Sequence, residues 1–169
     1  MGFWRCPSGL EVLSHKVFCS GSGYEVQAFH EAGYDVTAID FSPAAIDQAK
    51  RGLGVLAGRV IFGDFFTYNF ERGRFDLIYE RTFLCSMPPS HWPDYANRMA
   101  DLLSPGGRLV GIFLYGQQPE PPPYPLTDKQ AEQLFQRRFR QVRSELVTDS
   151  LPLFRGLERW HEWLKIDQA

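Results

Sequence analysis

Short apolar runs alternate along this chain with segments in which apolar residues recur every three or four positions. The first pattern predicts buried strands, and the second predicts amphipathic helices. Strand and helix alternate at least four times, which is typical of βαβ units in a mostly parallel sheet. The predicted strands are 17–19, 36–39, 60–62, 75–79, 108–114 and 142–147, and the predicted helices are 24–32, 44–51, 92–103 and 127–139.

Prolines, glycines and capping residues support several of these boundaries. Ser42-Pro43 supplies an N-cap and a first-turn proline for the helix that follows. The Pro-Gly-Gly of residues 105–107 ends a helix before the next strand. The proline-rich run 119–125 cannot continue a helix or lie inside a sheet, so it predicts an extended surface loop. The tail 157–166 fits a helix or a strand, because the spacing of its apolar residues suits both.

Composition places the chain among single-domain globular proteins. It has 169 residues, of which 44% are hydrophobic and 22% charged, and both fractions are ordinary. The formal net charge of −2 argues against a dedicated nucleic-acid binder. The chain has neither an apolar run of about 18 residues nor a secretory signal, so we expect no contact with a membrane. The three cysteines form no metal-binding or disulfide pattern, so we expect a reduced, cytoplasmic protein without a metal site.

Residues suited to ligand binding follow the first four predicted strands. They are Gly21-Ser22-Gly23, Asp40, Asp64 and Glu80-Arg81. In a parallel sheet the carboxyl ends of the strands lie at one edge, where ligands bind. Glycines at that edge let the backbone approach a ligand closely. Asp40 comes 17 residues after Gly23 and can accept both hydroxyl protons of a ribose, so the pair indicates nucleoside binding.

The glycine pattern bears on which nucleoside fits. A dinucleotide site of the usual kind has a third glycine, and Val26 stands at that position here. The sequence also has no Walker-type phosphate loop. A ligand with a ribose and no phosphate fits better, and S-adenosylmethionine is the common one. Asp64 beside Phe65 then suits the amino group and the ring of adenine, while an NAD-type dehydrogenase is the weaker option.

With these motifs the sequence resembles class I S-adenosylmethionine-dependent methyltransferases, and within them the thiopurine S-methyltransferase-like family. That family also holds thiol, thiocyanate and halide methyltransferases. The resemblance runs from about Val17 to the C-terminus, and its most family-specific segment is Tyr79-Glu80-Arg81-Thr82-Phe83. The segments that carry it are 21–26, 36–42, 63–66, 75–85, 88–89, 102–109, 122–124 and 155–160.

The resemblance implies a Rossmann-like α/β fold in a single domain, with a mostly parallel sheet and an antiparallel strand pair at its C-terminal end. It implies S-adenosyl-L-methionine as the cofactor, with Asp40 at the ribose and Asp64 and Phe65 at the adenine. Arg81 is expected to contact the cofactor, as is the backbone of Cys19. The full set of expected cofactor residues is Cys19, Gly21, Gly23, Asp40, Phe41, Asp64, Phe65, Glu80 and Arg81. The expected acceptor pocket contains Phe83, Cys85, Met87 and Tyr124.

A soft acceptor agrees with the shortage of candidate bases in the sequence. Methyl transfer from a sulfonium is an in-line displacement, for which the protein mostly supplies alignment and a dry site. A small thiol, thiopurine, thiocyanate or halide is nucleophilic without a strong base, and no histidine lies in a recognisable motif. A small amine, hydroxyl or carboxylate acceptor would instead need a proton-accepting residue near Glu80 or Tyr79. A non-catalytic module that binds the cofactor is the alternative from another class.

The first residues depart from the family pattern. Members normally carry a few dozen residues before the glycine motif, including tryptophans that close over the cofactor, whereas 18 residues precede Cys19 here. We therefore expect a shortened, atypical segment at 1–16, a methyltransferase domain at 17–169, and weakened cofactor affinity. Calorimetric titration with S-adenosylhomocysteine tests the last expectation. The protein is expected to be a monomer or weak dimer.

Overall fold

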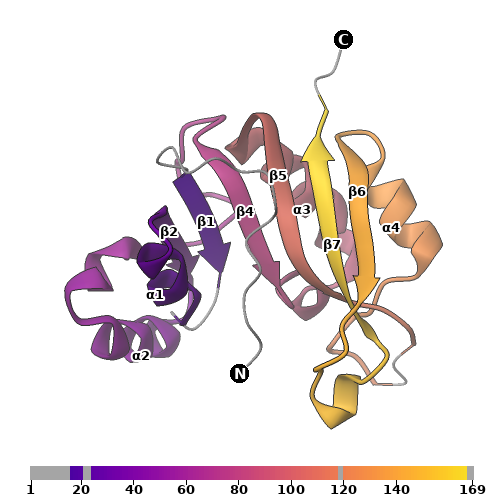
Figure 1. The fold of residues 1–169 in the computed structure, drawn as a ribbon, viewed down its shortest axis with the longest axis horizontal. Helices are drawn as coiled ribbons and strands as arrows, with labels where there is room; N and C mark the ends of the chain where they lie inside the picture. Colours follow the sequence, from indigo (N-terminus) through magenta and orange to yellow (C-terminus); the bar gives the residue numbers. More distant parts are fainter. Residues whose placement is uncertain (1–15, 21–23, 118–119, 167–169) are drawn as a thin grey trace.

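A seven-stranded sheet runs through the centre of the molecule (Figure 1). The computed structural model describes residues 16–20, 24–117 and 120–166. The strands are β1 (Lys16–Ser20), β2 (Asp35–Asp40), β3 (Val60–Phe62), β4 (Phe75–Arg81), β5 (Leu103–Leu114), β6 (Phe139–Leu146) and β7 (Glu158–Lys165). The α-helices are α1 (Tyr24–Glu31), α2 (Pro43–Leu53), α3 (Trp92–Leu102) and α4 (Asp128–Phe135). Short 3-10 helices lie at η1 (Gly54–Arg59), η2 (Leu84–Ser86), η3 (Pro89–His91) and η4 (Pro152–Phe154).

The strand order is β3-β2-β1-β4-β5-β7-β6. The pairs from β3 to β5 are parallel, and β7 runs antiparallel to both of its neighbours, β5 and β6. The order reverses direction between β1 and β4, which is the switch point where ligands bind in open α/β sheets. The expected α/β architecture, with a mostly parallel sheet and an antiparallel pair at its C-terminal end, is confirmed.

Two hydrophobic clusters cover the two faces of this sheet. Along β4, Leu77 and Tyr79 pack with residues of α1 and α2, whereas Ile78 between them packs with residues of α3 and α4. Alternation of this kind is what a strand buried on both faces produces, since successive side chains point to opposite sides. Figure 1 shows α3 behind the sheet and α1 and α2 at the end where β2 lies.

Local signals fix the element ends much as predicted. Ser42 caps α2, because its side chain accepts a hydrogen bond from the backbone N–H of Ala45, and Pro43 follows as the first helical residue. Regular pairing of β4 with β5 skips residues 104–107, since Phe75 pairs with Leu103 and Leu77 with Arg108. Gly106 lies there at a φ of 73°, a backbone conformation that favours glycine.

The structure corrects several boundaries and resolves one ambiguity. Strand β5 begins at Leu103, so the Pro-Gly-Gly of residues 105–107 lies within it and does not precede it as predicted. Helix α4 ends at Phe135 and not near Phe139. Strand β6 begins at Phe139 and not at residue 142. The two phenylalanines are four positions apart and both buried, so their spacing resembles a helix although only the first is helical. The tail forms β7, because pairing with β5 and β6 satisfies its backbone on both sides.

Candidate functional site

The carboxyl ends of three neighbouring strands meet at one edge of the sheet. Cys19 of β1 pairs with Ala38 of β2 and Tyr79 of β4, so the residues that follow each of them lie along the same edge. The backbone N–H of Gly63 donates to the carbonyl oxygen of Asp40 at 3.0 Å. This bond belongs to the parallel pairing of Asp40 with Phe62 at the end of β2 and β3, so Asp64 follows at the same edge.

Two carboxylates at this edge are oriented by the backbone. An oxygen of Asp40, Oδ1, accepts a hydrogen bond from the N–H of Ser42 at 2.8 Å, and Oδ1 of Asp64 accepts one from the N–H of Phe66 at 2.8 Å. The Asp40 side chain is partly exposed and that of Asp64 is exposed, while the neighbouring Phe41 is 73% exposed. Outward-facing, fixed carboxylates are suited to accept hydrogen bonds from hydroxyl and amino groups.

Phe65 lies beneath this edge and joins it to α3. Its ring is buried and packs edge-on against Phe83, with 5.4 Å between the ring centroids, and at 6.3 Å from Tyr95. The guanidinium of Arg98 donates through Nε to the carbonyl oxygen of Phe65 at 3.2 Å and also contacts the carbonyl of Tyr68. The loop after β3 is therefore held to α3 by both packing and hydrogen bonds.

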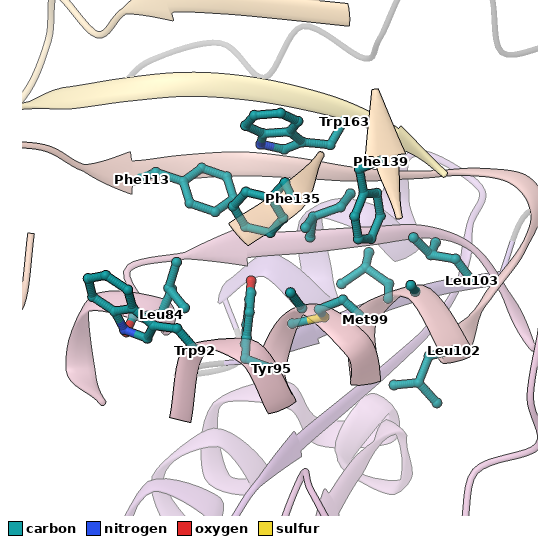
Figure 2. Packing of buried hydrophobic residues seen from close by; sticks show 14 of the residues in the cluster. Leu84, Trp92, Tyr95, Met99, Leu102, Leu103, Phe113, Phe135, Phe139 and Trp163 are labelled. Carbon is teal, nitrogen blue, oxygen red and sulfur yellow. The ribbon is translucent and has the colours of Figure 1, made fainter. Parts of the chain in front are cut away.

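Glu80 lies near the end of β4 with its carboxylate turned inward. Only 1% of the residue is exposed. Its Oε1 accepts from the N–H of Phe83 at 2.7 Å, and its Oε2 accepts from the N–H of Leu84 at 3.2 Å and from the hydroxyl of Tyr95 at 2.5 Å. Burial raises the pKa of Glu80 to about 7, and these hydrogen bonds oppose the rise. Figure 2 shows the Tyr95 hydroxyl pointing from α3 toward the sheet.

A small apolar pocket lies between the turn after β4 and strand β5. The gaps between its atoms add up to about 180 Å³ with open solvent included, and none of them admits a water-sized sphere, so a ligand there would need the surrounding side chains to move apart. Of the four acceptor candidates, Cys85 and Tyr124 line this pocket, and the N–H of Tyr124 donates to the carbonyl oxygen of Cys85 at 2.7 Å. The remaining walls are mostly aliphatic. The lining residues are Glu80, Thr82, Leu84, Cys85, Ile112, Phe113, Leu114, Tyr124 and Leu126.

The other expected residues fall in different places. Phe83 packs against Phe65 on the cofactor side of the turn, and Met87 is buried in the core cluster of α3 and α4. Arg81 is exposed at the end of β4. Cys19 is described by its backbone alone, and Gly21 and Gly23 lie outside the described residues, as does most of the expected atypical segment 1–16. The residue assignments therefore stay predictions.

The pKa values of Cys85 and Tyr79 bear on whether either side chain could act as a nucleophile or a base. Burial, followed by the charge of Glu80, raises the pKa of the Cys85 thiol to about 12, so this thiol is neutral at physiological pH and a poor nucleophile. Burial likewise raises the pKa of Tyr79 well above its usual value, so its phenol stays protonated at neutral pH and has no free base form to accept a proton. Within the described ranges, no three His, Cys, Asp or Glu side chains gather in a way that could hold a metal ion. None of the helices described here is long and apolar enough to cross a bilayer.

Sequence analysis missed several residues that the structure brings to the site. Ile112 and Leu114 of β5 read as ordinary core residues, and Leu126 reaches the pocket because the chain after β5 folds back to form a bridge with Tyr115. Tyr95 lies 15 residues from Glu80 along the chain, so its hydrogen bond depends on how α3 packs. The helical spacing of Tyr95 with Met99 and Leu102 indicates only a buried face.

Comparison with known proteins adds a family and relatives. The family model described as thiopurine S-methyltransferase matches residues 5–164. The probable thiol methyltransferase 2 of Arabidopsis thaliana is 30% identical over 153 residues, which are 86% of this chain and 66% of that protein. The thiopurine S-methyltransferase of Vibrio campbellii is 40% identical over 76 residues, which are 44% of this chain and 34% of that protein. The chain thus spans less than two thirds of the length of either relative.

Solved structures show the same fold. A methyltransferase from Methanosarcina mazei, described as S-adenosylmethionine-dependent, superposes with a TM-score of 0.77 and 16% identity, covering 92% of this chain and 94% of that chain. The 1,6-didemethyltoxoflavin-N1-methyltransferase of Burkholderia thailandensis, solved with S-adenosylhomocysteine and 1,6-didemethyltoxoflavin bound, superposes with a TM-score of 0.73 and 21% identity. That match covers 90% of this chain and 72% of the other. The fold is that of class I methyltransferases.

Proposed function

The chain belongs to the thiopurine S-methyltransferase family, and on that basis we propose that it transfers a methyl group from S-adenosylmethionine to a small, soft nucleophile. The acceptor is a thiol, a thiopurine, thiocyanate or a halide. The observation that carries the proposal is the meeting of two backbone-oriented carboxylates, Asp40 and Asp64, at neighbouring strand ends of a class I methyltransferase fold. The named activities of the relatives support the same chemistry.

The donor set at the strand edge fits the proposed cofactor. Asp40 would accept hydrogen bonds from the ribose hydroxyls, and Asp64 would accept them from the adenine amino group. Phe41 is exposed next to Asp40 and would cover apolar surface of the nucleoside, while Phe65 would bound the adenine site from below. Cys19 and Arg81, together with Gly21 and Gly23 outside the described residues, are the remaining residues that we propose for this site. When bound, the cofactor supplies an activated methyl group on a sulfonium.

The pocket residues would align the acceptor and exclude water. Cys85 and Tyr124, with the aliphatic side chains beside them, form a wall that contacts soft, polarisable atoms well. Such a site lowers the barrier mainly by holding the two reactants in line. The high pKa of Cys85 argues against an enzyme-bound methyl intermediate on that thiol, so direct transfer between the two ligands is the proposed route.

A turnover assay tests this function. The protein is incubated with methyl-labelled S-adenosylmethionine and, in turn, an aliphatic thiol, a thiopurine, thiocyanate and iodide, and the methylated product is measured. We expect turnover with at least one of the four. Asp40→Ala should abolish it, and Asp47→Ala, which removes an exposed carboxylate on α2, should not. Cofactor binding without turnover on any of the four would contradict the soft-acceptor assignment, and absence of cofactor binding would contradict the function itself.

The setting proposed for this activity is the cytoplasm, with residues 17–169 forming the methyltransferase domain and the protein a monomer or weak dimer. The buried, unpaired thiol of Cys85 is consistent with a reducing compartment. Sedimentation equilibrium tests the oligomeric state, and a mass above that of a dimer would contradict it.

A further inference from the structure

The turn that follows β4 is held from below by the side chain of a strand residue. Three hydrogen-bond donors from two elements converge on the Glu80 carboxylate, namely the N–H groups of Phe83 and Leu84 and the hydroxyl of Tyr95. The two N–H groups begin the short helix η2 and have no partner within it. The carboxylate therefore acts as a cap from outside the turn, while the tyrosine fixes the carboxylate to α3.

The backbone of this turn needs such an anchor. Thr82 adopts a φ of 58°, in the left-handed region that a threonine occupies only when its surroundings hold it there. Other bonds also hold the turn: the N–H of Thr82 donates to the carbonyl of Ile112 at 3.3 Å, and the Trp92 indole N–H donates to the carbonyl of Leu84 at 3.3 Å. Within the turn, the Cys85 thiol donates to the carbonyl of Thr82 at 3.2 Å. The bond from the Phe83 N–H to Glu80, at 2.7 Å, is charge-assisted and shorter than the thiol bond, and its acceptor belongs to strand β4.

The anchored turn forms part of both proposed ligand sites. Thr82, Leu84 and Cys85 line the apolar pocket. The ring of Phe83, which lies between them in the chain, packs against Phe65 on the cofactor side. The carbonyl of Cys85 also holds the N–H of Tyr124, so the opposite wall of the pocket depends on the position of the turn.

We infer that Glu80 and Tyr95 are positioning residues for methyl transfer: the buried carboxylate and the tyrosine hydroxyl hold the turn at residues 82–86 so that the acceptor pocket keeps its shape next to the cofactor. This inference rests on the proposed function. It assigns Glu80 a role through the turn, in place of the direct cofactor contact expected from sequence. Glu80 also lines the pocket, so exchange at the turn amides, and not the acceptor KM alone, distinguishes positioning from direct contact.

A set of substitutions separates positioning from general stability. Glu80→Ala removes both acceptor oxygens, Tyr95→Phe removes one donor, and Glu80→Gln keeps an acceptor for Phe83 and a polar partner for Tyr95. Ser104→Ala is the matched control, because it removes a 3.0 Å hydrogen bond to Asp76 in the same pair of strands, away from the turn. Steady-state kinetics for the acceptor and calorimetric titration with S-adenosylhomocysteine are measured for each variant.

We expect Glu80→Ala to raise the acceptor KM about tenfold or more, since small displacements of aligned reactants are costly, with a cofactor affinity within about threefold of the unaltered protein. Glu80→Gln should restore most of the loss, and Ser104→Ala should change neither quantity by more than about twofold. The acceptor kcat/KM of the unaltered protein should also show an ionisation near neutral pH that Glu80→Gln lacks. The titratable groups facing Glu80 are Tyr95 from α3 and Cys85 from the turn, and Tyr79 precedes Glu80 on the opposite face of the strand.

Amide hydrogen exchange provides a readout that is independent of turnover. If Glu80→Ala fails to fold, the same measurement is made on Tyr95→Phe. Exchange at Phe83 and Leu84 should quicken at least about tenfold in the Tyr95→Phe or Glu80→Ala variants while β4 stays protected. Unchanged exchange at these amides would overturn the inference, and so would an unchanged acceptor KM in a variant that binds the cofactor. Absence of turnover by the unaltered protein would instead overturn the proposed function, even if exchange at Phe83 and Leu84 quickened in the variants as expected.

Discussion

Glu80 and His161 are both buried ionisable side chains, but their surroundings differ: one accepts several hydrogen bonds and the other lies among aromatic rings. At the carboxyl edge of the sheet, Glu80 receives hydrogen bonds from three donors. On β7, His161 is 2% exposed, and neither of its ring nitrogens has a hydrogen-bond partner among the residues that the structure describes. Its ring stacks between Tyr115 and Trp163, with ring centroids at 5.3 Å and 5.4 Å.

Glu80 and its three donors form a polar cluster with a fixed geometry. His161 belongs instead to an aromatic layer, in which its ring contacts those of Phe113, Tyr115 and Trp163. Three donors aimed at Glu80 specify one geometry for the turn that they hold, because hydrogen bonds are directional. The layer around His161 is held by burial and ring contacts, which specify volume more than direction. Figure 2 shows this layer, with Phe113, Phe135 and Trp163 close together on one side of the sheet. We therefore expect substitutions in the two regions to affect different quantities.

The largest effect on stability is expected in the aromatic layer. Phe135→Ala removes a fully buried ring that packs against Phe113, Phe139 and Trp163, and it should lower the free energy of unfolding by about 3–5 kcal/mol. Cofactor affinity of the folded protein should stay the same. Urea unfolding measures the first quantity, and Leu151→Ala, at an exposed leucine, is the control expected to cost under about 0.5 kcal/mol. A loss below about 1 kcal/mol would contradict this assignment of the layer.

The next largest effect is the contribution of His161 to the pH dependence of the free energy of unfolding between pH 4 and 6.5. Burial lowers the pKa of His161 from 6.5 to about 4, so between these values the unfolded chain binds a proton that the folded chain does not. This contribution makes stability rise with pH across that window, by up to about 3 kcal/mol at 1.36 kcal/mol per unit. His161→Leu should remove it. Urea unfolding from pH 4 to 7 measures the difference from the unaltered protein, and a pH-independent difference would rule out the role of His161.

Glu80 should change the free energy of unfolding with pH by a similar amount, but in the opposite direction. Its folded pKa of about 7 exceeds its usual value of 4.5, so the folded chain binds the extra proton in this window. The Glu80 contribution is fully present below pH 4.5 and is lost as the pH rises through about 7. The two windows overlap, so each group masks the other in the unaltered protein. Glu80→Gln should therefore expose a rise in stability from pH 4 to 6.5, and a falling profile in that variant would contradict the assignment.

The smallest effect is expected at the rim of the aromatic layer. The Arg159 guanidinium lies 4.3 Å from the centroid of the Tyr115 ring and also pairs with Asp128. Exposed cation–π and ion pairs contribute little, so Arg159→Ala should lower the free energy of unfolding by about 0.5–1 kcal/mol. Arg143→Ala, which loses an exposed ion pair with Glu145 and no described ring contact, serves as the comparison in the same urea titration. A loss equal to that of Arg143→Ala would show that the ring contact contributes nothing measurable.

The sequence alone predicted the strands β1 to β4 of the parallel part of the sheet well, and it predicted the element bounds beyond them less well. Strands ending at Asp40 and near Glu80 are short, apolar and bounded by turn residues, so local pattern determines them. The ends of α4 and β6 depend on long-range pairing with β7, which a helical spacing of Phe135 and Phe139 does not reveal. The motifs placed Asp40 and Asp64 at the edge, but the inward turn of Glu80 depends on contacts with α3 that lie far along the chain.

Titration with S-adenosylhomocysteine tests the central claim, a cofactor site at the carboxyl edge of the sheet, most directly. Isothermal calorimetry on the unaltered protein should show saturable binding at one site per chain. The same measurement on Asp40→Ala should show that binding is lost, with Asp47→Ala as the matched control that keeps it. Absence of binding by the unaltered protein, or equal affinity in Asp40→Ala, would contradict the account.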